Sequence, residues 1–308
     1  MDTLFPAPPA LPRLPRFRRA EGYPQIRIGR PEQLILCALG RFHFLSAPQL
    51  TRLLFSQGSL TYTREHLKRL FHAGYVQRLF LPTPTPSGSS PAIYALDKKG
   101  FGYLKALSAA PKGRFRASEQ GQREWLFLEH TLAVNDLLIL AERLARQDSS
   151  IKLANMIHER QLKRTPIYVE DGEDRIGVVP DGWLDIRQGD LQSCLAIELD
   201  RSGHVERKPF QRKVRGFCRY AQGPYQKAFG SQSLTVVIVA TSGTRRLSEL
   251  IRWTETELAS TGAQDQADLF RLSAFDPATA DPNDAFFATI WRRPFDPNPL
   301  PLLPRVSA

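Results

Sequence analysis

The sequence predicts an α+β protein of two domains, and two observations carry this prediction. Residues 1 to 125 contain 19 Lys and Arg against 7 Asp and Glu, a net charge of +12, whereas residues 126 to 308 contain 23 against 24, a net charge of −1. The apolar pattern also changes along the chain, from short helical segments to strands that alternate with helices. A basic N-terminal domain therefore precedes a near-neutral domain built on a mixed sheet.

Residues 1 to 28 are rich in Pro and Arg, with Arg13, Arg16, Arg18 and Arg19 among them. This composition cannot bury a core, so the segment is predicted to be a disordered arm. The arm either contacts phosphates or serves as a solubilising tail, and the sequence leaves both readings open.

Residues 29 to 107 predict three short helices followed by a two-stranded hairpin. The predicted elements are helices from Pro31, over Ser46–Phe55 and from Ser59 or Thr61 to Phe71, strands over Tyr75–Leu81 and Ala92–Leu96, and a loop over 82–91. Ser46 is a good N-cap, and Gly74 after Ala73 is typical of a helix stop. This order is typical of a winged helix-turn-helix domain, whose third helix enters the major groove of DNA.

The third helix divides into an apolar and a polar face. Leu60, Leu67, Leu70 and Phe71 are expected to face inward. The residues expected to contact double-stranded DNA are Thr61, Thr63, Arg64, Lys68 and Arg69. The alternative is a winged helix that serves protein contacts only. A further short helix after Leu96 is of a kind that links or dimerises such modules, which leaves a homodimer open.

The small, polar and basic residues 108 to 122 predict a linker, and residues 123 to 295 predict the second domain. Its predicted elements are a helix over Trp125–Arg146, strands over Asn155–Arg160, Gly177–Ile186, Cys194–Leu199 and Leu234–Ala240, an edge strand over Phe270–Ser273 and a final strand over Phe286–Trp291. The run Leu234–Ala240 is continuously apolar but for Thr235, which indicates a central strand covered by helices on both faces. Residues 296 to 308 are expected to be a Pro-rich tail.

Two carboxylates lie at the ends of neighbouring predicted strands. Asp181 follows Pro180, Glu198 lies on the next strand, and the turn-rich link 187–190 predicts that the two strands form a hairpin. Carboxylate oxygens suit Mg²⁺, so Asp181 and Glu198, with Asp200 as an auxiliary ligand, form a candidate metal site. The alternative reading is two turn carboxylates beside a solvated basic helix.

This order of elements resembles the core of PD-(D/E)XK nucleases, in which a lysine follows the second carboxylate by two residues. Position 200 is Asp in this chain, so that lysine is missing, and Lys213 on the following helix is the candidate replacement. A compact cation there favours an attacking water and offsets charge on the phosphate. On the first helix of the domain, Glu129 is either a metal ligand or a solvated carboxylate, and His130 is expected to brace the core.

The chain as a whole resembles the replication-relaxation family of plasmid and mobile-element proteins over about residues 30 to 295. The resemblance is carried by Tyr94-Ala95-Leu96 with Gly100, by Glu129 to Asp136, by Pro180-Asp181-Gly182, and by Ile197 to Arg201 with Lys213 and Tyr220. It implies DNA binding in replication, relaxation or transfer of a mobile element, a nuclease-like C-terminal fold, and replication or relaxase proteins as further partners.

Several classes of protein are disfavoured by composition. No run of about 18 apolar residues occurs and the N-terminus lacks the order of a signal peptide, so a cytoplasmic protein without a membrane span is expected. Cys37, Cys194 and Cys218 have no Cys-x-x-Cys spacing and are expected to be core thiols. A DNA-binding protein is favoured, the alternative is a Mg²⁺-dependent endodeoxyribonuclease using Asp181, Glu198 and Lys213, and a pure protein adaptor does not account for the basic first part.

Overall fold

The computed structural model describes residues 14–23, 25–81, 91–111, 115, 124–201, 206–231 and 233–305. Within it the chain forms two compact units, Met1–Arg123 and Glu124–Ala308. Both helices and strands are present, with one large mixed sheet in the second unit. None of the described helices is long and apolar enough to cross a membrane.

Within its described residues, the N-terminal unit packs four helices around a three-stranded sheet of order β1-β3-β2. Its elements are α1 (Arg30–Phe42), β1 (Leu45–Ser46), α2 (Ala47–Leu54), α3 (Leu60–His72), β2 (Val76–Phe80), β3 (Ala92–Leu96) and α4 (Lys98–Ala106). The predicted cap of α2 is confirmed, because Ser46 Oγ accepts a hydrogen bond from Gln49 N at 3.3 Å. Ile35, Leu50 and Leu67 are fully buried and join α1, α2 and α3 in one core.

The prediction of a disordered N-terminal arm is wrong for residues 16 to 20. Arg19 Nε donates to Phe71 O at 2.9 Å, Ala20 N donates to His72 Nδ1 at 3.1 Å, and Phe17 packs on Phe80 with ring centroids 4.9 Å apart. The aromatic and arginine side chains of this segment therefore find partners on α3 and β2. Residues 1 to 13, the predicted loop from 82 to 90 and most of the linker lie outside the described residues.

The C-terminal unit has a seven-stranded mixed sheet of order β12-β11-β10-β9-β8-β7-β4. Its strands are β4 (Ile151–His158), β7 (Gly182–Gln188), β8 (Leu191–Asp200), β9 (Thr235–Ala240), β10 (Phe270–Ala274), β11 (Trp291–Arg293) and β12 (Asp296–Leu300), with β5 (Ile167–Asp171) and β6 (Asp174–Val178) as a separate hairpin. The apolar strand β9 is central, as predicted, and the structure shows that it lies parallel to both neighbours. The predicted hairpin of β7 and β8 is also confirmed, and it turns at Gly189, whose φ is +58°.

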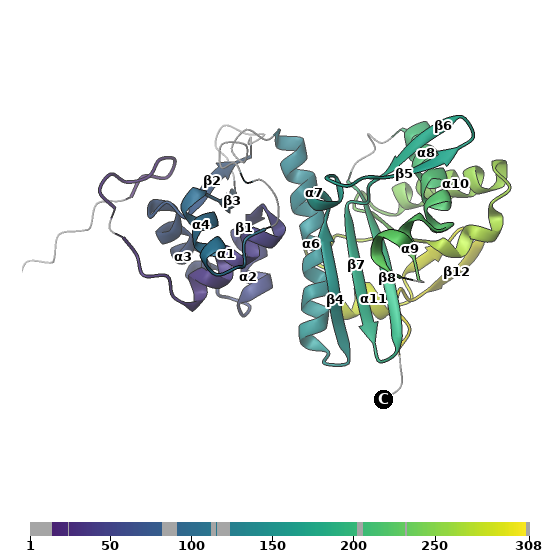
Figure 1. Ribbon diagram of the computed structural model, residues 1–308. Helices are drawn as coiled ribbons and strands as arrows, with labels where there is room; N and C mark the ends of the chain where they lie inside the picture. The colour runs from purple at the N-terminus through teal and green to yellow at the C-terminus, as the bar shows by residue number, and fades with distance from the viewer. Residues whose placement is uncertain are drawn as a thin grey trace, which may run out of the picture. The chain divides into compact units, whose positions relative to one another are not determined.

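Helices cover both faces of this sheet (Figure 1). They are α6 (Trp125–Gln147), α7 (Glu159–Leu162), α8 (Arg207–Ala221), α9 (Pro224–Phe229), α10 (Thr244–Ser260), the 3₁₀ helix η1 (Gln264–Leu269) and α11 (Pro282–Phe287). Helices α6 and α11 pack together on one face, and α8 packs beside α10 on the other. Alternate residues of β8 therefore face different helices: Ala196 belongs to the core beneath α8 and α10, whereas Ile197 faces α6 and α11.

Three strand predictions are wrong in this unit. The expected strand Gly177–Ile186 is interrupted at Val179–Asp181, where Pro180 has no N–H to donate to a ladder. Phe286–Trp291 is not one strand: Phe286 and Phe287 end helix α11, which Asp281 caps by accepting a hydrogen bond from Asn283 N at 2.8 Å, and β11 begins only at Trp291. The segment Phe270–Ala274 is an interior strand, and residues Asp296–Leu300 of the expected tail form the edge strand β12.

Candidate functional site

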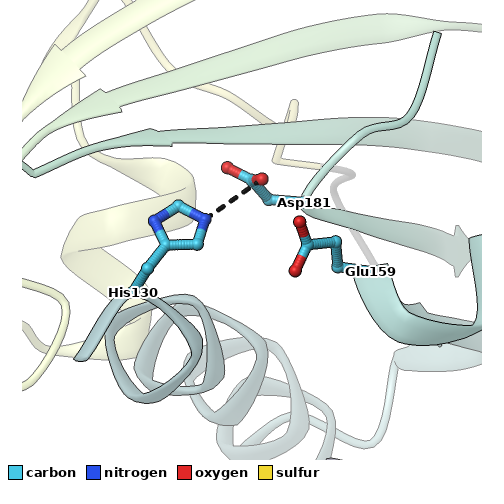
Figure 2. Close-up of side chains that lie close together, drawn as sticks. All are labelled: His130, Glu159 and Asp181. Carbon is cyan, nitrogen blue, oxygen red and sulfur yellow. Dashed lines mark ion pairs between the residues drawn. The ribbon is translucent and has the colours of Figure 1, made fainter. Parts of the chain in front are cut away.

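Asp181 lies in the break between β6 and β7 and is held there by main-chain hydrogen bonds. Its N–H donates to Ile197 O at 2.8 Å, its carbonyl accepts from Glu159 N at 3.1 Å, and its carboxylate Oδ2 accepts from Leu199 N at 2.9 Å. The other oxygen, Oδ1, lies 3.2 Å from Nε2 of His130 on α6 (Figure 2). The side chain is buried and fixed where β7 begins, beside the end of the neighbouring interior strand β8.

Glu198 lies on β8 next to this carboxylate, and Lys213 of α8 reaches it. The Lys213 ammonium forms a hydrogen bond and ion pair with Glu198 Oε2. Glu198 is buried, and its Oε1 has no hydrogen-bond partner among the residues that the structure describes. The Lys213 side chain remains 47 % exposed. The structure thus brings Asp181, Glu198 and Lys213 together.

The pKa values of these groups reflect burial and mutual charge. Burial raises the pKa of Glu198 to about 8, because the stabilising charge of Lys213 is outweighed by burial together with the nearby Asp181 carboxylate. Burial also acts to raise the pKa of Asp181, but His130, Lys213 and the Leu199 N–H lower it overall. Burial opposes the charge on Lys213, yet the two carboxylates raise its pKa. The site therefore combines an ionised Asp with a Glu that readily holds a proton.

A second group of polar atoms shares Asp181. His130, Glu159 and Asp181 each offer one atom within 4.8 Å of the others, in an arrangement that could hold a metal ion (Figure 2). Glu159 is the first residue of α7 and also contacts the ammonium of Lys163. Burial disfavours a charged His130, but the Asp181 carboxylate raises the pKa of this imidazole above its usual value. His130 therefore donates to Asp181 and orients it.

His130 and Glu159 are the residues that the sequence did not indicate as site members. Their signal was positional only, since Glu159 lies inside the predicted strand Asn155–Arg160 and His130 lies in a largely apolar helix. Glu129, considered as a ligand, instead pairs with Arg201 at 3.1 Å.

The prediction that Asp200 is an auxiliary metal ligand is wrong. Both of its carboxylate oxygens are bound by Arg246 of α10, at 3.0 Å from Nε and 2.9 Å from Nη2. Asp200 and Arg246 are both 6 % exposed, and the guanidinium also lies over the Trp253 ring. Asp200 does share a sheet face with Glu198, but an arginine occupies its lone pairs.

The raised pKa of Glu198 predicts how the stability of the C-terminal unit depends on pH. A carboxyl whose pKa rises from 4.5 to about 8 on folding stabilises the folded chain fully below pH 4.5 and loses this contribution as the pH rises through 8. Glu198→Gln keeps a neutral group of similar size. In EDTA, the urea midpoint of the variant is therefore expected to rise relative to that of the wild-type protein between pH 5 and pH 8.5. A constant difference between the two proteins over this interval would contradict the assignment.

On α3 of the N-terminal unit, four of the five residues predicted to contact DNA are accessible to solvent and one is buried. Thr61, Arg64 and Arg69 are exposed and Lys68 is partly exposed. Lys68 Nζ lies 3.7 Å from Glu65 Oε2. Arg69 Nη1 lies 3.0 Å from Oε1 of the buried Glu32 of α1, and this ion pair holds the guanidinium of Arg69 in place.

The prediction for Thr63 is wrong. Its side chain is fully buried, donates to Ser59 O at 3.0 Å and accepts from Thr51 of α2 at 2.9 Å. Thr63 therefore joins α3 to α2 and presents no atom to a ligand.

Taken together, the fold and the site define a two-unit protein with a carboxylate and lysine cluster at the ends of two interior strands of a mixed sheet. The chain belongs to the replication-relaxation family, whose model matches residues 36–235. No curated protein matches the chain. Among solved structures, restriction endonuclease FokI bound to DNA is similar at 12 % identity over 76 % of this chain and 45 % of that chain, with a TM-score of 0.22. The present chain thus spans less than half of that structure, and the likeness is too weak to support an argument.

Proposed function

We propose that this protein binds DNA and acts in the replication, relaxation or mobilisation of a plasmid or other mobile element. Membership of the replication-relaxation family suggests this role. The N-terminal unit supports it, because three helices followed by a short antiparallel sheet have the order of a winged helix-turn-helix domain. Its third helix carries exposed cations, and the basic excess of the chain lies in residues 1 to 125.

In this proposal α3 is the recognition helix for double-stranded DNA. Thr61, Arg64 and Lys68 lie on its solvent face, while Leu67 and Leu70 anchor the helix to the core. Arg64 has no carboxylate partner among the described residues, so its charge is available to a phosphate or to a base edge. Arg69 joins α3 to α1 through its ion pair with Glu32. In this proposal Arg69 also contacts DNA, more weakly than Arg64 does, because Glu32 offsets its charge.

The double variant Arg64→Ala/Lys68→Ala tests the recognition helix. Loss of two phosphate contacts is expected to lower affinity for duplex DNA on the order of 10-fold or more at 0.1 M salt, and to flatten the plot of log affinity against log salt by about 1.8. Fluorescence anisotropy with a labelled duplex at several salt concentrations measures both quantities. The control is Lys98→Ala/Lys105→Ala, which removes two exposed charges from α4. Equal losses in the two variants would show only a general charge effect.

A second activity, Mg²⁺-dependent cleavage of one DNA strand, is favoured by a specific observation. Lys213 restores the cation that the sequence motif lacks at position 200, and it does so from the neighbouring helix α8. In this proposal the C-terminal unit is a PD-(D/E)XK-like domain whose reaction is hydrolysis of a phosphodiester bond. Asp181, Glu198 and Lys213 would carry that reaction.

The donor set fits a hard divalent cation. Glu198 Oε1 is a buried carboxylate oxygen without a partner among the described residues, and the Asp181 carboxylate adjoins it. Asp181 and Glu198 would hold Mg²⁺, with Glu159 and His130 close to Asp181. When bound, the ion would polarise the phosphodiester and lower the pKa of water. Lys213 would hold its ammonium beside the same phosphate and stabilise the charge that develops there.

The roles of His130 and Leu199 in this proposal are positional. The Leu199 N–H and the His130 imidazole bind different oxygens of Asp181, so the carboxylate cannot rotate. A fixed carboxylate favours one geometry of the attacking water and the scissile phosphate. The test is incubation of purified protein with supercoiled plasmid in Mg²⁺ or Mn²⁺ against EDTA, with nicked circles as the expected product.

A further inference from the structure

His130, Glu159 and Asp181 come from three separate segments of the C-terminal unit and meet at one point. His130 lies on α6, Glu159 begins α7, and Asp181 occupies the break between β6 and β7. One ligand atom of each lies within 4.8 Å of those of the other two, and Figure 2 shows the imidazole and both carboxyl groups turned toward one another. Among the residues that the structure describes, no other group of three His, Cys, Asp or Glu side chains has this spacing.

The two carboxylates of this group are buried and are held in place by the main chain. Asp181 is 6 % exposed and Glu159 is 7 % exposed. The Glu159 N–H donates to the carbonyl oxygen of Asp181 at 3.1 Å, and the Leu199 N–H donates to Asp181 Oδ2, so that Oδ1 faces His130. Burial of neighbouring carboxylates is costly unless a cation compensates them. Because these two are already fixed, they lose little freedom when they bind one.

The distance between Nε2 of His130 and Oδ1 of Asp181 is 3.2 Å, which fits two ligands of one metal ion. Ligand atoms about 2.1 Å from a metal, at angles between octahedral and tetrahedral, are about 3.0 to 3.4 Å apart. A charge-assisted hydrogen bond between an imidazolium and a carboxylate is usually shorter, about 2.7 to 2.9 Å. An ion can therefore replace the proton on Nε2 without a large movement of either side chain.

The group is accessible to ions from solvent. The His130 side chain is 30 % exposed, so water can reach the group and complete the coordination of an ion. The ammonium of Lys163 contacts Oε1 of Glu159, but the Lys163 side chain is 53 % exposed and can withdraw into solvent. The Glu159 carboxylate also has a second oxygen. Lys163 therefore competes with an ion for Glu159 without closing the site.

We infer that His130, Glu159 and Asp181 bind a divalent transition-metal ion of the class of Mn²⁺. An imidazole nitrogen beside two carboxylates suits this class, whereas Mg²⁺ prefers oxygen ligands alone. The site is distinct from the proposed Mg²⁺ site of Asp181 and Glu198, with which it shares one residue. The inference goes beyond the proposed function, because it requires neither DNA nor cleavage and it gives His130 and Glu159 a ligand of their own.

The test is binding of Mn²⁺ by the full chain in the absence of DNA. Pulsed electron paramagnetic resonance detects a coordinating imidazole nitrogen through its modulation of the Mn²⁺ signal, and a titration followed by the same resonance measures affinity. The wild-type protein is expected to show the nitrogen signal. Glu198→Gln removes a ligand of the proposed Mg²⁺ site alone and should keep this signal, so the affinities of further variants are measured in that background.

In the Glu198→Gln background, His130→Gln keeps an amide that can donate to Asp181 but removes the imidazole. It is expected to abolish the nitrogen signal and to weaken Mn²⁺ binding about 100-fold or more, since loss of even an outer-sphere partner of a metal costs about 10- to 100-fold. Glu159→Gln is expected to weaken binding to a similar degree. The matched control is Glu129→Gln, which changes the carboxylate next to His130 that pairs with Arg201, and it should leave the affinity unchanged.

The outcomes separate this inference from the proposed function. A wild-type protein that nicks plasmid in Mg²⁺ but binds no Mn²⁺, or binds it without a nitrogen signal, would overturn the inference and leave the proposed cleavage standing. Full Mn²⁺ affinity in the His130→Gln variant would also overturn it. A protein that holds Mn²⁺ through His130 but neither binds DNA nor nicks plasmid would support the inference and remove the proposed function.

Discussion

Glu198→Gln is expected to lower the rate of Mg²⁺-dependent plasmid nicking by about 10²- to 10³-fold, the typical effect of removing one preorganised electrostatic contact to a transition state. The substitution keeps the size of the side chain but removes the negative charge that a divalent cation needs. Lys213→Met is expected to give a loss of similar size, because it removes the cation and retains most of the aliphatic stem. Conversion of supercoiled plasmid to nicked circles over time measures the rate.

The matched control is Glu170→Gln, which changes a carboxylate on β5 that is 76 % exposed and pairs with Arg175. This variant should retain the wild-type rate. Asp181→Asn with wild-type activity would show that the cutting comes from elsewhere, and no nicking by the wild-type protein would remove the proposed cleavage and leave only the proposed DNA binding.

The second large effect concerns stability. Arg246→Met is expected to lower the free energy of unfolding of the C-terminal unit by about 3 to 5 kcal/mol, because it leaves the buried Asp200 carboxylate without a counter-ion. All four tryptophans, Trp125, Trp183, Trp253 and Trp291, lie after residue 123, so tryptophan fluorescence in urea reports on this unit.

Two further variants make the measurement specific. Arg245→Met changes a neighbouring side chain that is 95 % exposed and is expected to alter stability by less than about 0.5 kcal/mol. Asp200→Asn combined with Arg246→Met removes the uncompensated charge, and it should recover part of the loss. A double variant as unstable as the sum of the two single variants would argue against a direct pair.

Much of the fold could be predicted from local pattern. The apolar residues of β9 identify a strand covered on both faces, and the turn at Gly189 joins two runs of strand-forming residues. The segment Asp296–Leu300 could not be recognised as a strand, because its prolines are tolerated only at a sheet edge and the sequence does not reveal which strand is at the edge.

The candidate site, like the fold, could be predicted from the sequence only in part. Glu198 could be placed because it stands near the end of a recognisable strand, Asp181 because it follows Pro180 ahead of the apolar run of β7, and Lys213 because it lies on the helix that follows. The Arg246 partner of Asp200 lies 46 positions further along and is brought to it only by the tertiary fold. The error at Thr63 was avoidable, since its spacing of three from Leu60 and four from Leu67 places it on the inner stripe of α3.

The two buried carboxylates of β8 also bear on how the C-terminal unit folds. Glu198 and Asp200 face the same side of the strand, and each is neutralised by a different helix, Lys213 of α8 and Arg246 of α10. A sheet that forms before these helices dock leaves two acids facing a hydrophobic layer, which is costly. Half-assembled states are therefore penalised, and strand and helices are expected to form in one cooperative step, with α8 and α10 unable to exchange places.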